Sequence, residues 1–254
     1  MVDLHKYELP IAQALTADYI EGKQQVIETL YGYYAGNQED WVKRSSRLTQ
    51  LQHTRVESMT LANVLKAYNE RLSASEETLA NIAHIAQGAK VVIGGQQAGI
   101  WTGPLLVVHK AVSVIQAALS ASEQLQEKVV PVFWIAGEDH DWDEVNHTYL
   151  ISTEQQLKKL SINRDATLRT AVSRTAISTE QWQEVIEELS QQLPGSEFKE
   201  QLIQDLVLMG EKSSSLSDFF GHMLSTLFAK YGLVLIDSDD PQVRAIESNM
   251  FARY

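Results

Sequence analysis

The sequence predicts an α/β fold with a parallel sheet at its core and a helical region before it. A β-branched run at 91–93 ends in two glycines, and a loop punctuated by glycine and proline then leads into an apolar helix. A second apolar run at 130–136 follows, so the order is strand, loop, helix, strand. A right-handed crossover between such strands brings both carboxyl ends to one edge of the sheet. We therefore expect residues 96–102 and 138–147 to face each other across a crevice at that edge.

The composition is that of an ordinary globular protein. The 254 residues are enough for one large core or two smaller ones, and 44% of them are apolar and 21% charged. A net charge of −12 argues against a nucleic-acid partner, because phosphate binding needs clustered lysine and arginine. No signal-peptide pattern and no continuous apolar run near the ~20 residues of a membrane span is present, so we expect no membrane association. The lack of cysteine excludes disulfides and thiolate metal sites and favours a cytoplasmic location.

Residues 1–88 are predicted to form a helical region that packs on the core. Positions 16–34 are expected to form one helix with an acidic first turn. A second helix has its apolar positions within 56–72, and a third begins after Ser75 and ends at Gly88. A basic cluster lies on the segment that links the first two helices, and we expect it to be solvated, with an anion contact as the alternative. This cluster consists of Trp41, Lys43, Arg44 and Arg47.

Residues 89–254 are predicted to form the α/β core, with a helical insertion at about 178–231. The first helix of the core has apolar residues at helical spacing, and Pro104 suits its first turn. Runs at 147–152 and 157–163 are expected to pair as two short strands. Within the insertion, Ser178 is placed to cap the first helix. The apolar positions expected on one face of the first core helix are Leu105, Val108, Ala111, Val112, Ile115, Ala118 and Leu119.

A third strand of the sheet is predicted near the end of the chain. An amphipathic helix over 216–231 ends at Gly232, and the apolar run 233–236 follows and closes in the acidic sequence DSDDP. Helix, glycine, strand and acid in this order are typical of a returning unit in a parallel sheet. The last residues resemble the start of another helix that stops at Tyr254, so we expect the core to be truncated at its C-terminus.

The loop after the first strand, GGQQAGIWTGP, is rich in glycine. It matches neither GxGxxG nor GxxxxGK[ST], so no phosphate-binding motif is predicted. A glycine-rich turn that leads into a helix still offers free backbone N–H groups to an anion. The alternative is that the glycines only allow strand and helix to pack closely, and that Lys110 is a solvated lysine. The candidate binding residues are Gly95, Gln96, Gln97, Gly99, Thr102, Gly103 and Lys110.

The loop after the second strand holds seven ionisable residues within ten positions. Because like charges repel, this loop needs a cation or hydrogen-bond donors to stabilise it. The bulky neighbours Phe133, Trp134 and Trp142 disfavour a simple solvated loop. Carboxylate and imidazole suit Mg, Mn or Zn, so a metal site is an alternative, but no HExxH-type pattern is present and we predict no metal.

We favour recognition of a substrate amine or hydroxyl at this acidic loop, together with general acid–base work. The catalytic candidates are Glu138, His140, Asp141 and His147. The binding candidates are Asp139, Glu144 and Asn146.

Two blocks of the chain closely resemble the bacillithiol biosynthesis cysteine-adding enzymes: GGQQAGIWTGPLLVVHK and VVPVFWIAGEDHDWDEVNH. The segments DYIEG and LVLIDSDDP also look like segments of this family, so the resemblance covers the whole chain. It implies a Rossmann-like core similar to the class I nucleotidyltransferases, in particular the cysteinyl ligases. It also implies a C-terminal coiled coil, missing here, through which full-length relatives form a homodimer.

The reaction that this resemblance implies is that of a ligase for small-molecule substrates. It adds the carboxyl group of L-cysteine to the glucosamine amine of glucosaminyl-malate and gives the low-molecular-weight thiol bacillithiol. In that superfamily the loop after the first strand binds nucleotide, and the role falls here on Gln96, Gln97, Gly99, Thr102 and Gly103. An adenine nucleotide is therefore suspected, but no HxGH sequence is present, so the cofactor is left unassigned. The alternatives are a metal-dependent nucleotidyl- or phosphoryl-transfer enzyme and a non-catalytic nucleotide-binding module.

Overall fold

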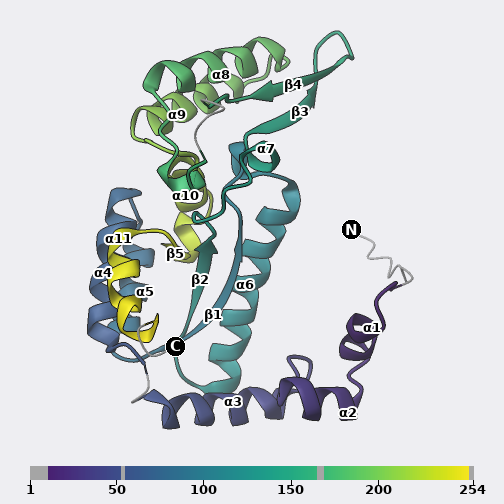
Figure 1. Cartoon of the computed structure of the whole chain (residues 1–254), viewed down its shortest axis with the longest axis vertical. Coiled ribbons are helices and arrows are strands. Elements are labelled where there is room, and N and C mark those ends of the chain that lie inside the picture. Colours follow the sequence, from purple (N-terminus) through teal and green to yellow (C-terminus); the bar gives the residue numbers. More distant parts are fainter. Residues whose placement is uncertain (1–10, 53–54, 165–168, 252–254) are drawn as a thin grey trace. The chain divides into compact units, whose positions relative to one another are not determined.

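The computed structural model describes residues 11–52, 55–164 and 169–251 (Figure 1). The two ends of the chain lie outside these ranges, so the expected absence of a signal peptide and the expected interruption of the last helix at Tyr254 stay predictions. The chain forms two compact units. One comprises the residues up to Arg55 together with Glu123–Gln126, and the other comprises Val56–Ser122 and the residues from Glu127 onward. The second unit contains the sheet and every candidate site residue.

The first unit is helical but lacks the single helix predicted over 16–34. Gly22 and Gly32 have φ of +67° and +73°, and these left-handed residues break the segment after its first helix and again after a π-helical turn. The basic cluster, predicted on a linking segment, lies instead on a 13-residue helix whose N-cap Asn37 accepts a hydrogen bond from the Glu39 N–H. The segments are α1 (Ala14–Ile20), α2 (Gln24–Val26), the π-helical turn (Ile27–Tyr31) and α3 (Gln38–Gln50).

The second unit contains the predicted parallel sheet. Its strands are β1 (Lys90–Gln96), β2 (Val129–Ile135) and β5 (Val234–Asp237), in the order β1-β2-β5. All three run parallel, and Gln96 pairs with Ile135, which in turn pairs with Asp237. The three carboxyl ends therefore lie at one edge, which confirms the predicted α/β class.

The middle strand β2 is buried on both faces. Phe133 and Ile135 pack into one apolar cluster, whereas Val130 and Val132 pack into another. Side chains alternate between the two sides of a strand, so a continuous apolar run such as this one is what a strand covered on both faces requires.

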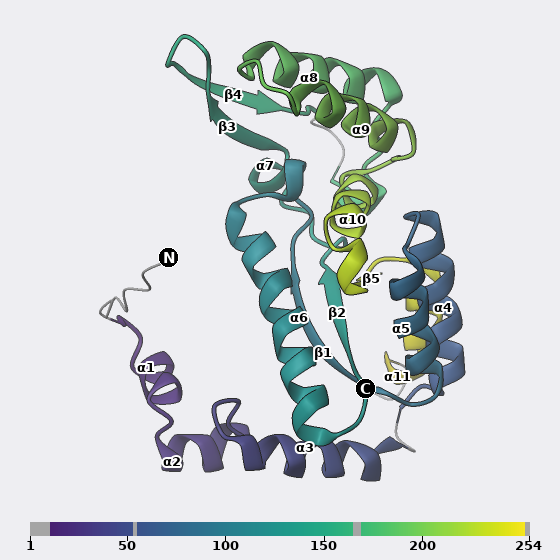
Figure 2. The ribbon, with the colours of Figure 1, turned by 180° about the vertical axis from the view of Figure 1, so that it is seen from behind.

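Helices cover the two faces of this sheet (Figures 1 and 2). Helices α6 (Leu105–Leu125) and α10 (Leu216–Leu227) contribute to the cluster on one face. Helices α4 (Ser58–Arg71), α5 (Glu76–Ala86) and α11 (Pro241–Phe251) contribute to the cluster on the other. Helix α5 begins after Ser75, which caps it, and the chain leaves it through Gly88 at φ +89°, as predicted.

Helix α6 buries three of the seven expected apolar positions and leaves three of them exposed. Leu105, Val112 and Leu119 are exposed, while Val107 and Val114 are buried. The prediction was wrong for these positions because the helix is apolar on most sides, so the sequence pattern does not single out one face. By length and composition alone α6 could cross a membrane, and among the described residues it is the one helix that could. A core helix passes the same test, and six α6 residues are buried.

The remaining elements follow the predicted order. The two short strands pair antiparallel, and Ser178 and Gln181 form a capping box at the start of the insertion. The amphipathic helix predicted over 216–231 ends earlier, at Leu227, and a 3₁₀ turn leads to Gly232. These elements are β3 (His147–Ile151), β4 (Leu157–Ser161), α8 (Thr179–Gln192) and α9 (Lys199–Glu211).

Candidate functional site

The loop between β1 and α6 has a strained backbone. It contains a 3₁₀ turn (Ile100–Thr102), in which Trp101 and Thr102 have φ of 52° and 67°. Positive φ is unfavourable for a β-branched threonine, and strain of this kind persists only where the surroundings enforce it. Gly103 follows at φ 71° and ψ −158°, a conformation essentially restricted to glycine. Ile100 and Thr102 are buried, which anchors the loop on the core.

Two further glycines let the backbone pack closely. A Cβ at Gly95 would lie 2.4 Å from the Trp134 carbonyl oxygen, and one at Gly99 would lie 3.1 Å from the Gly103 Cα. Close packing of strand and helix is therefore one role of these glycines, and this was one of the two interpretations of the glycine-rich loop. The Gly103 N–H donates to the Ile100 carbonyl oxygen at 2.9 Å, so the other interpretation rests on the remaining backbone N–H groups of the loop.

The acidic loop after β2 meets the glycine loop. The Ala136 N–H donates to the Gln96 carbonyl oxygen at 3.0 Å, and Gln97 Nε2 donates to Asp139 Oδ2 at 2.5 Å. The two segments therefore lie together at the carboxyl edge of the sheet, as their positions after neighbouring parallel strands predict.

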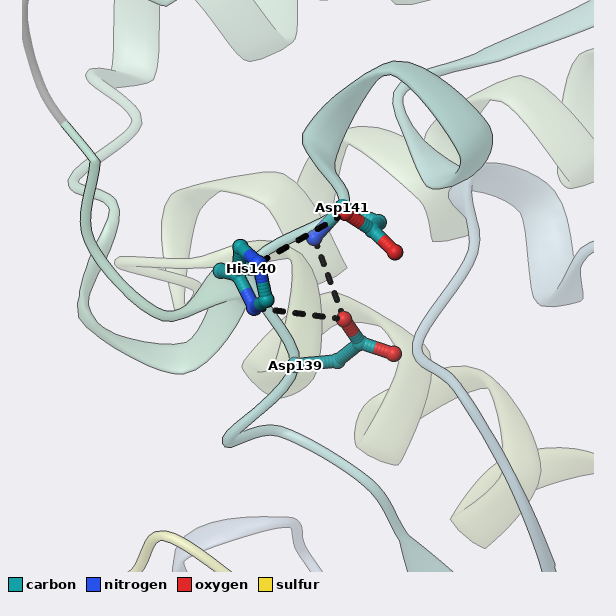
Figure 3. A group of neighbouring side chains, drawn as sticks. All are labelled: Asp139, His140 and Asp141. Carbon is teal, nitrogen blue, oxygen red and sulfur yellow. Dashed lines mark hydrogen bonds and ion pairs between the residues drawn. The ribbon is translucent and has the colours of Figure 1, made fainter.

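Asp139, His140 and Asp141 form the centre of the acidic loop (Figure 3). His140 Nδ1 lies 4.0 Å from Asp139 Oδ1, and its Nε2 lies 3.8 Å from Asp141 Oδ1. The hydrogen bond from Gln97, together with the backbone N–H groups of Asp141 and His140, holds the pKa of the Asp139 carboxyl below its ordinary value. The ligand atoms of the three residues lie within 4.8 Å of one another and could hold a cation. We assign no ion, because exposed acidic groups often gather without one.

The other candidates are placed differently. Lys110 Nζ donates to Gln96 Oε1 at 2.5 Å, so this lysine belongs to the glycine loop. Asn146 is buried, and its Nδ2 donates to the Ile162 carbonyl oxygen at 3.0 Å while its Oδ1 lies 3.1 Å from His147 Nδ1. This arrangement gives Asn146 a structural contact in the hairpin. Glu138 and Glu144 are exposed, and within the described residues no hydrogen bond or ion pair of their side chains is seen.

A cavity of about 370 Å³ opens beside the acidic loop. It contains two arginines that the sequence did not single out, Arg164 and Arg169, which come after β4 and belong to no motif. The Arg164 guanidinium lies 5.3 Å from the ring centre of Trp142, the first residue of the short helix α7 (Trp142–Val145). The residues that line the cavity are His140, Asp141, Trp142, Asp143, Glu144, Arg164 and Arg169.

The acidic run that closes β5 was noted in the sequence, but none of its residues was predicted as a site residue. Asp239 accepts hydrogen bonds from Arg174 Nε and Nη2 at 2.6 Å, and another from the Ser173 hydroxyl at 2.7 Å. These contacts fasten a 3₁₀ turn (Val172–Arg174) to the end of β5. Asp237 is buried against Gly137, where a Cβ would lie 2.3 Å from its Oδ1, and burial raises its pKa to about 6.

Replacing Gln97 with alanine should raise the pKa of Asp139 toward its ordinary value, because the Gln97 amide is the largest cause of the depression. Carboxyl titration by carbon-13 NMR measures this directly. Replacing Gln116, an exposed residue of α6, with alanine is the matched control and should leave the titration unchanged. An Asp139 pKa that is the same with and without the Gln97 amide would show that the two loops are not joined in solution.

Comparison with known proteins places this chain among bacterial relatives. Residues 2–254 match the family described as "Bacillithiol biosynthesis BshC, N-terminal Rossmann-like domain". A protein named "Putative cysteine ligase BshC" from Bacillus cytotoxicus is 37% identical over 253 residues, which are 99% of this chain and 46% of that protein. Its namesake from Lysinibacillus sphaericus is 38% identical over 248 residues, which are 98% of this chain and 45% of that protein.

This chain thus spans about half the length of the curated relatives that it matches. The match runs through both loops of the candidate site and through all three strands of the sheet. It confirms the resemblance that the two sequence blocks indicate. The chain belongs to the BshC family of bacillithiol biosynthesis and corresponds to the N-terminal Rossmann-like domain of that family.

Proposed function

We propose that this chain provides the Rossmann-like part of a ligase that joins the carboxyl group of L-cysteine to the amine of glucosaminyl-malate and so forms bacillithiol. The names of the relatives support a cysteine ligase. The observation that carries the proposal is the hydrogen bond between Gln97 and Asp139, which brings an amide-rich loop and an acidic loop to one edge of the sheet.

The chemistry assigns different tasks to the two loops. An amine must lose a proton before its nitrogen attacks the carboxyl carbon, and one carboxyl oxygen must leave as the C–N bond forms. Asp139, with its lowered pKa, remains ionised and suits the binding of the substrate ammonium. His140 and Asp141 are exposed beside it and suit the acceptance of the released proton, with Glu138 and His147 as further candidates.

The carboxyl group also needs activation, because a free carboxylate is a poor electrophile. The glycine loop fits an anionic activating group such as a nucleotide: Lys110 places its ammonium at Gln96, and α6 begins immediately after Gly103 and Pro104. Gln97 would complete this binding surface, whereas Gly99 and Thr102, which are buried, would support the loop that forms it. A bound nucleotide would supply the leaving group, while this chain would hold and orient the two substrates.

The family resemblance is the ground for three further parts of the proposal. The substrates are small molecules, the enzyme acts in the cytoplasm, and the complete protein forms a homodimer through a coiled coil in its other half.

A chimeric protein tests the proposed function. This chain replaces the matching 46% of the Bacillus cytotoxicus relative. The chimera is then given L-cysteine, glucosaminyl-malate and ATP, and we expect a thiol product by mass spectrometry. Replacing His140 with alanine should reduce turnover by about 100-fold, the lower range for general acid–base catalysis. Replacing Glu154, in the turn between β3 and β4, with alanine should leave turnover unchanged.

Two results would contradict the proposal. A folded chimera that forms no product while its parent does would show that this chain does not support the reaction. The absence of product from both proteins would show that the assigned substrates are wrong.

A further inference from the structure

We infer that the cavity beside the acidic loop binds the sugar substrate as a zwitterion, with Arg164 and Arg169 taking the two malate carboxylates and the acidic side chains taking the ammonium group. This inference rests on the proposed function, and it assigns the malate end to a specific pair of residues.

The cavity carries charges of both signs. Asp141, Asp143 and Glu144 contribute carboxylates to its lining, and Arg164 and Arg169 contribute guanidinium groups. Within the described residues no ion pair joins the two sets, and the carboxylate contacts near His140 involve only Asp139 and Asp141. The opposite charges are thus not neutralised by each other. A volume of about 370 Å³ lies within the range of pockets that bind small molecules.

Arg164 is held in a definite position. Its guanidinium lies 5.3 Å from the ring centre of Trp142, and its Nη1 donates to the Thr170 carbonyl oxygen at 3.3 Å. Trp142 is 2% exposed, so it offers a fixed surface for the guanidinium. A guanidinium that lies on a ring keeps N–H groups at its edge, and these suit a carboxylate in a two-hydrogen-bond geometry.

Trp142 provides an independent sign that this cavity accepts a polar group. Its indole Nε1 is buried and has no hydrogen-bond acceptor among the described residues. Buried donors are nearly always paired, and an unpaired one calls for a water molecule or a ligand group that completes it. Trp142 lines the cavity and contacts Arg164. A ligand in the cavity would therefore alter the environment of the Trp142 indole.

The chemistry of the substrate matches this distribution of charge. In glucosaminyl-malate the amine is on the second ring carbon and the malate is attached to the first, so the ammonium and the group that carries two carboxylates are bonded to adjacent carbons of one sugar. A site for such a molecule must present acidic and basic side chains side by side. L-Cysteine is also a zwitterion, but it carries a single carboxylate, so a pair of arginines suits the dicarboxylate better.

Calorimetry on the whole chain tests the inference with three probes: glucosaminyl-malate, methyl glucosaminide and L-malate. The variants are Arg164→Gln, Arg169→Gln and the double variant. Each single change should weaken glucosaminyl-malate binding by about tenfold, since a charge-assisted hydrogen bond is lost. Binding of methyl glucosaminide, which has no carboxylate, should change by less than about twofold. Lys159→Gln, which removes an exposed positive charge from β4, should leave all three affinities unchanged.

Arg169 is exposed, so its replacement tests the inference even if the change at Arg164 disturbs the packing on Trp142. If wild type and double variant bind glucosaminyl-malate equally well, this inference is overturned and the proposed function is left intact. Wild-type protein that binds none of the three probes would overturn the proposed function and this inference together. Weaker binding of glucosaminyl-malate by about tenfold in each single variant, with methyl glucosaminide unaffected, would support the inference.

Discussion

Replacing Asn69 with alanine should lower the free energy of unfolding by about 3 kcal/mol. Asn69 lies on α4 and is 1% exposed. Its Nδ2 donates to the Leu235 carbonyl oxygen at 2.8 Å, and its Oδ1 accepts from the Leu235 N–H at 3.0 Å. Leu235 is fully buried and lies on β5, an outer strand of the sheet. The amide of Asn69 therefore forms the backbone hydrogen bonds that a neighbouring strand would otherwise form. Alanine would leave two buried backbone groups unpaired, and each costs about 1–3 kcal/mol.

Urea unfolding monitored by circular dichroism measures this loss. Lys66→Ala is the matched control, because Lys66 is on the same helix and its ion pair with Glu70 is exposed, so its removal should have little effect. An Asn69→Ala variant within about 1 kcal/mol of the wild type would show that water or a neighbouring group replaces the amide.

The sheet was predictable from the sequence, whereas the contact of Asn69 was not. The three strands are short β-branched runs bounded by glycine or charged residues, and the chain order forces them into parallel pairing. Asn69 is a polar residue within a helical pattern, and nothing local shows that it meets a strand 166 positions later. Such side-chain-to-backbone contacts depend on the final packing, which a periodic pattern does not encode.

The helices show the limit of periodic patterns in a different way. The segment 16–34 has helical composition, but Gly22 adopts positive φ and α1 ends at Ile20, well before the predicted end at Tyr34. An isolated glycine within a helical pattern is compatible with either outcome. In α6 the opposite problem arises, because 13 of its 21 residues are apolar and the buried face is set by the sheet it meets.

The sequence predicts the contacts of the candidate site that sheet topology determines, but not those that long-range packing determines. Gln97 and Asp139 meet because both follow neighbouring parallel strands. Arg164 and Asp237 come from other parts of the chain and reach the same edge of the sheet through the hairpin and β5. A charged residue directly after a buried strand was the available signal for Asp237, and no local signal existed for Arg164.

Replacing Asp237 with asparagine should stabilise the protein at pH 7.5 by up to about 3 kcal/mol and have little effect at pH 4. Burial, reinforced by the carboxylates of Asp239 and Asp218, raises the pKa of Asp237 from 3.8 to about 6. Between about pH 4 and pH 6 the folded protein keeps a proton that the unfolded chain has lost, so stability falls as the pH rises through this window. Above about pH 6 the full penalty is present, and a shift of about two pKa units corresponds to about 3 kcal/mol.

The pKa shift of Asp237 is opposite in direction to that of its neighbour Asp239. The guanidinium of Arg174 lowers the pKa of Asp239, so Asp239 stabilises the fold when it is ionised. Asparagine keeps the Oδ1 that accepts the Asp239 N–H at 2.8 Å, so the turn after β5 is retained. The free energy of unfolding is measured for wild type and variant at pH 4 and at pH 7.5, and the change caused by the substitution is compared between the two pH values. Asp143→Asn, at an exposed position, is the control. Equal effects of the substitution at both pH values would mean that Asp237 is ionised in the folded protein throughout this range, and that the edge of the sheet where the two loops meet is more hydrated than its burial indicates.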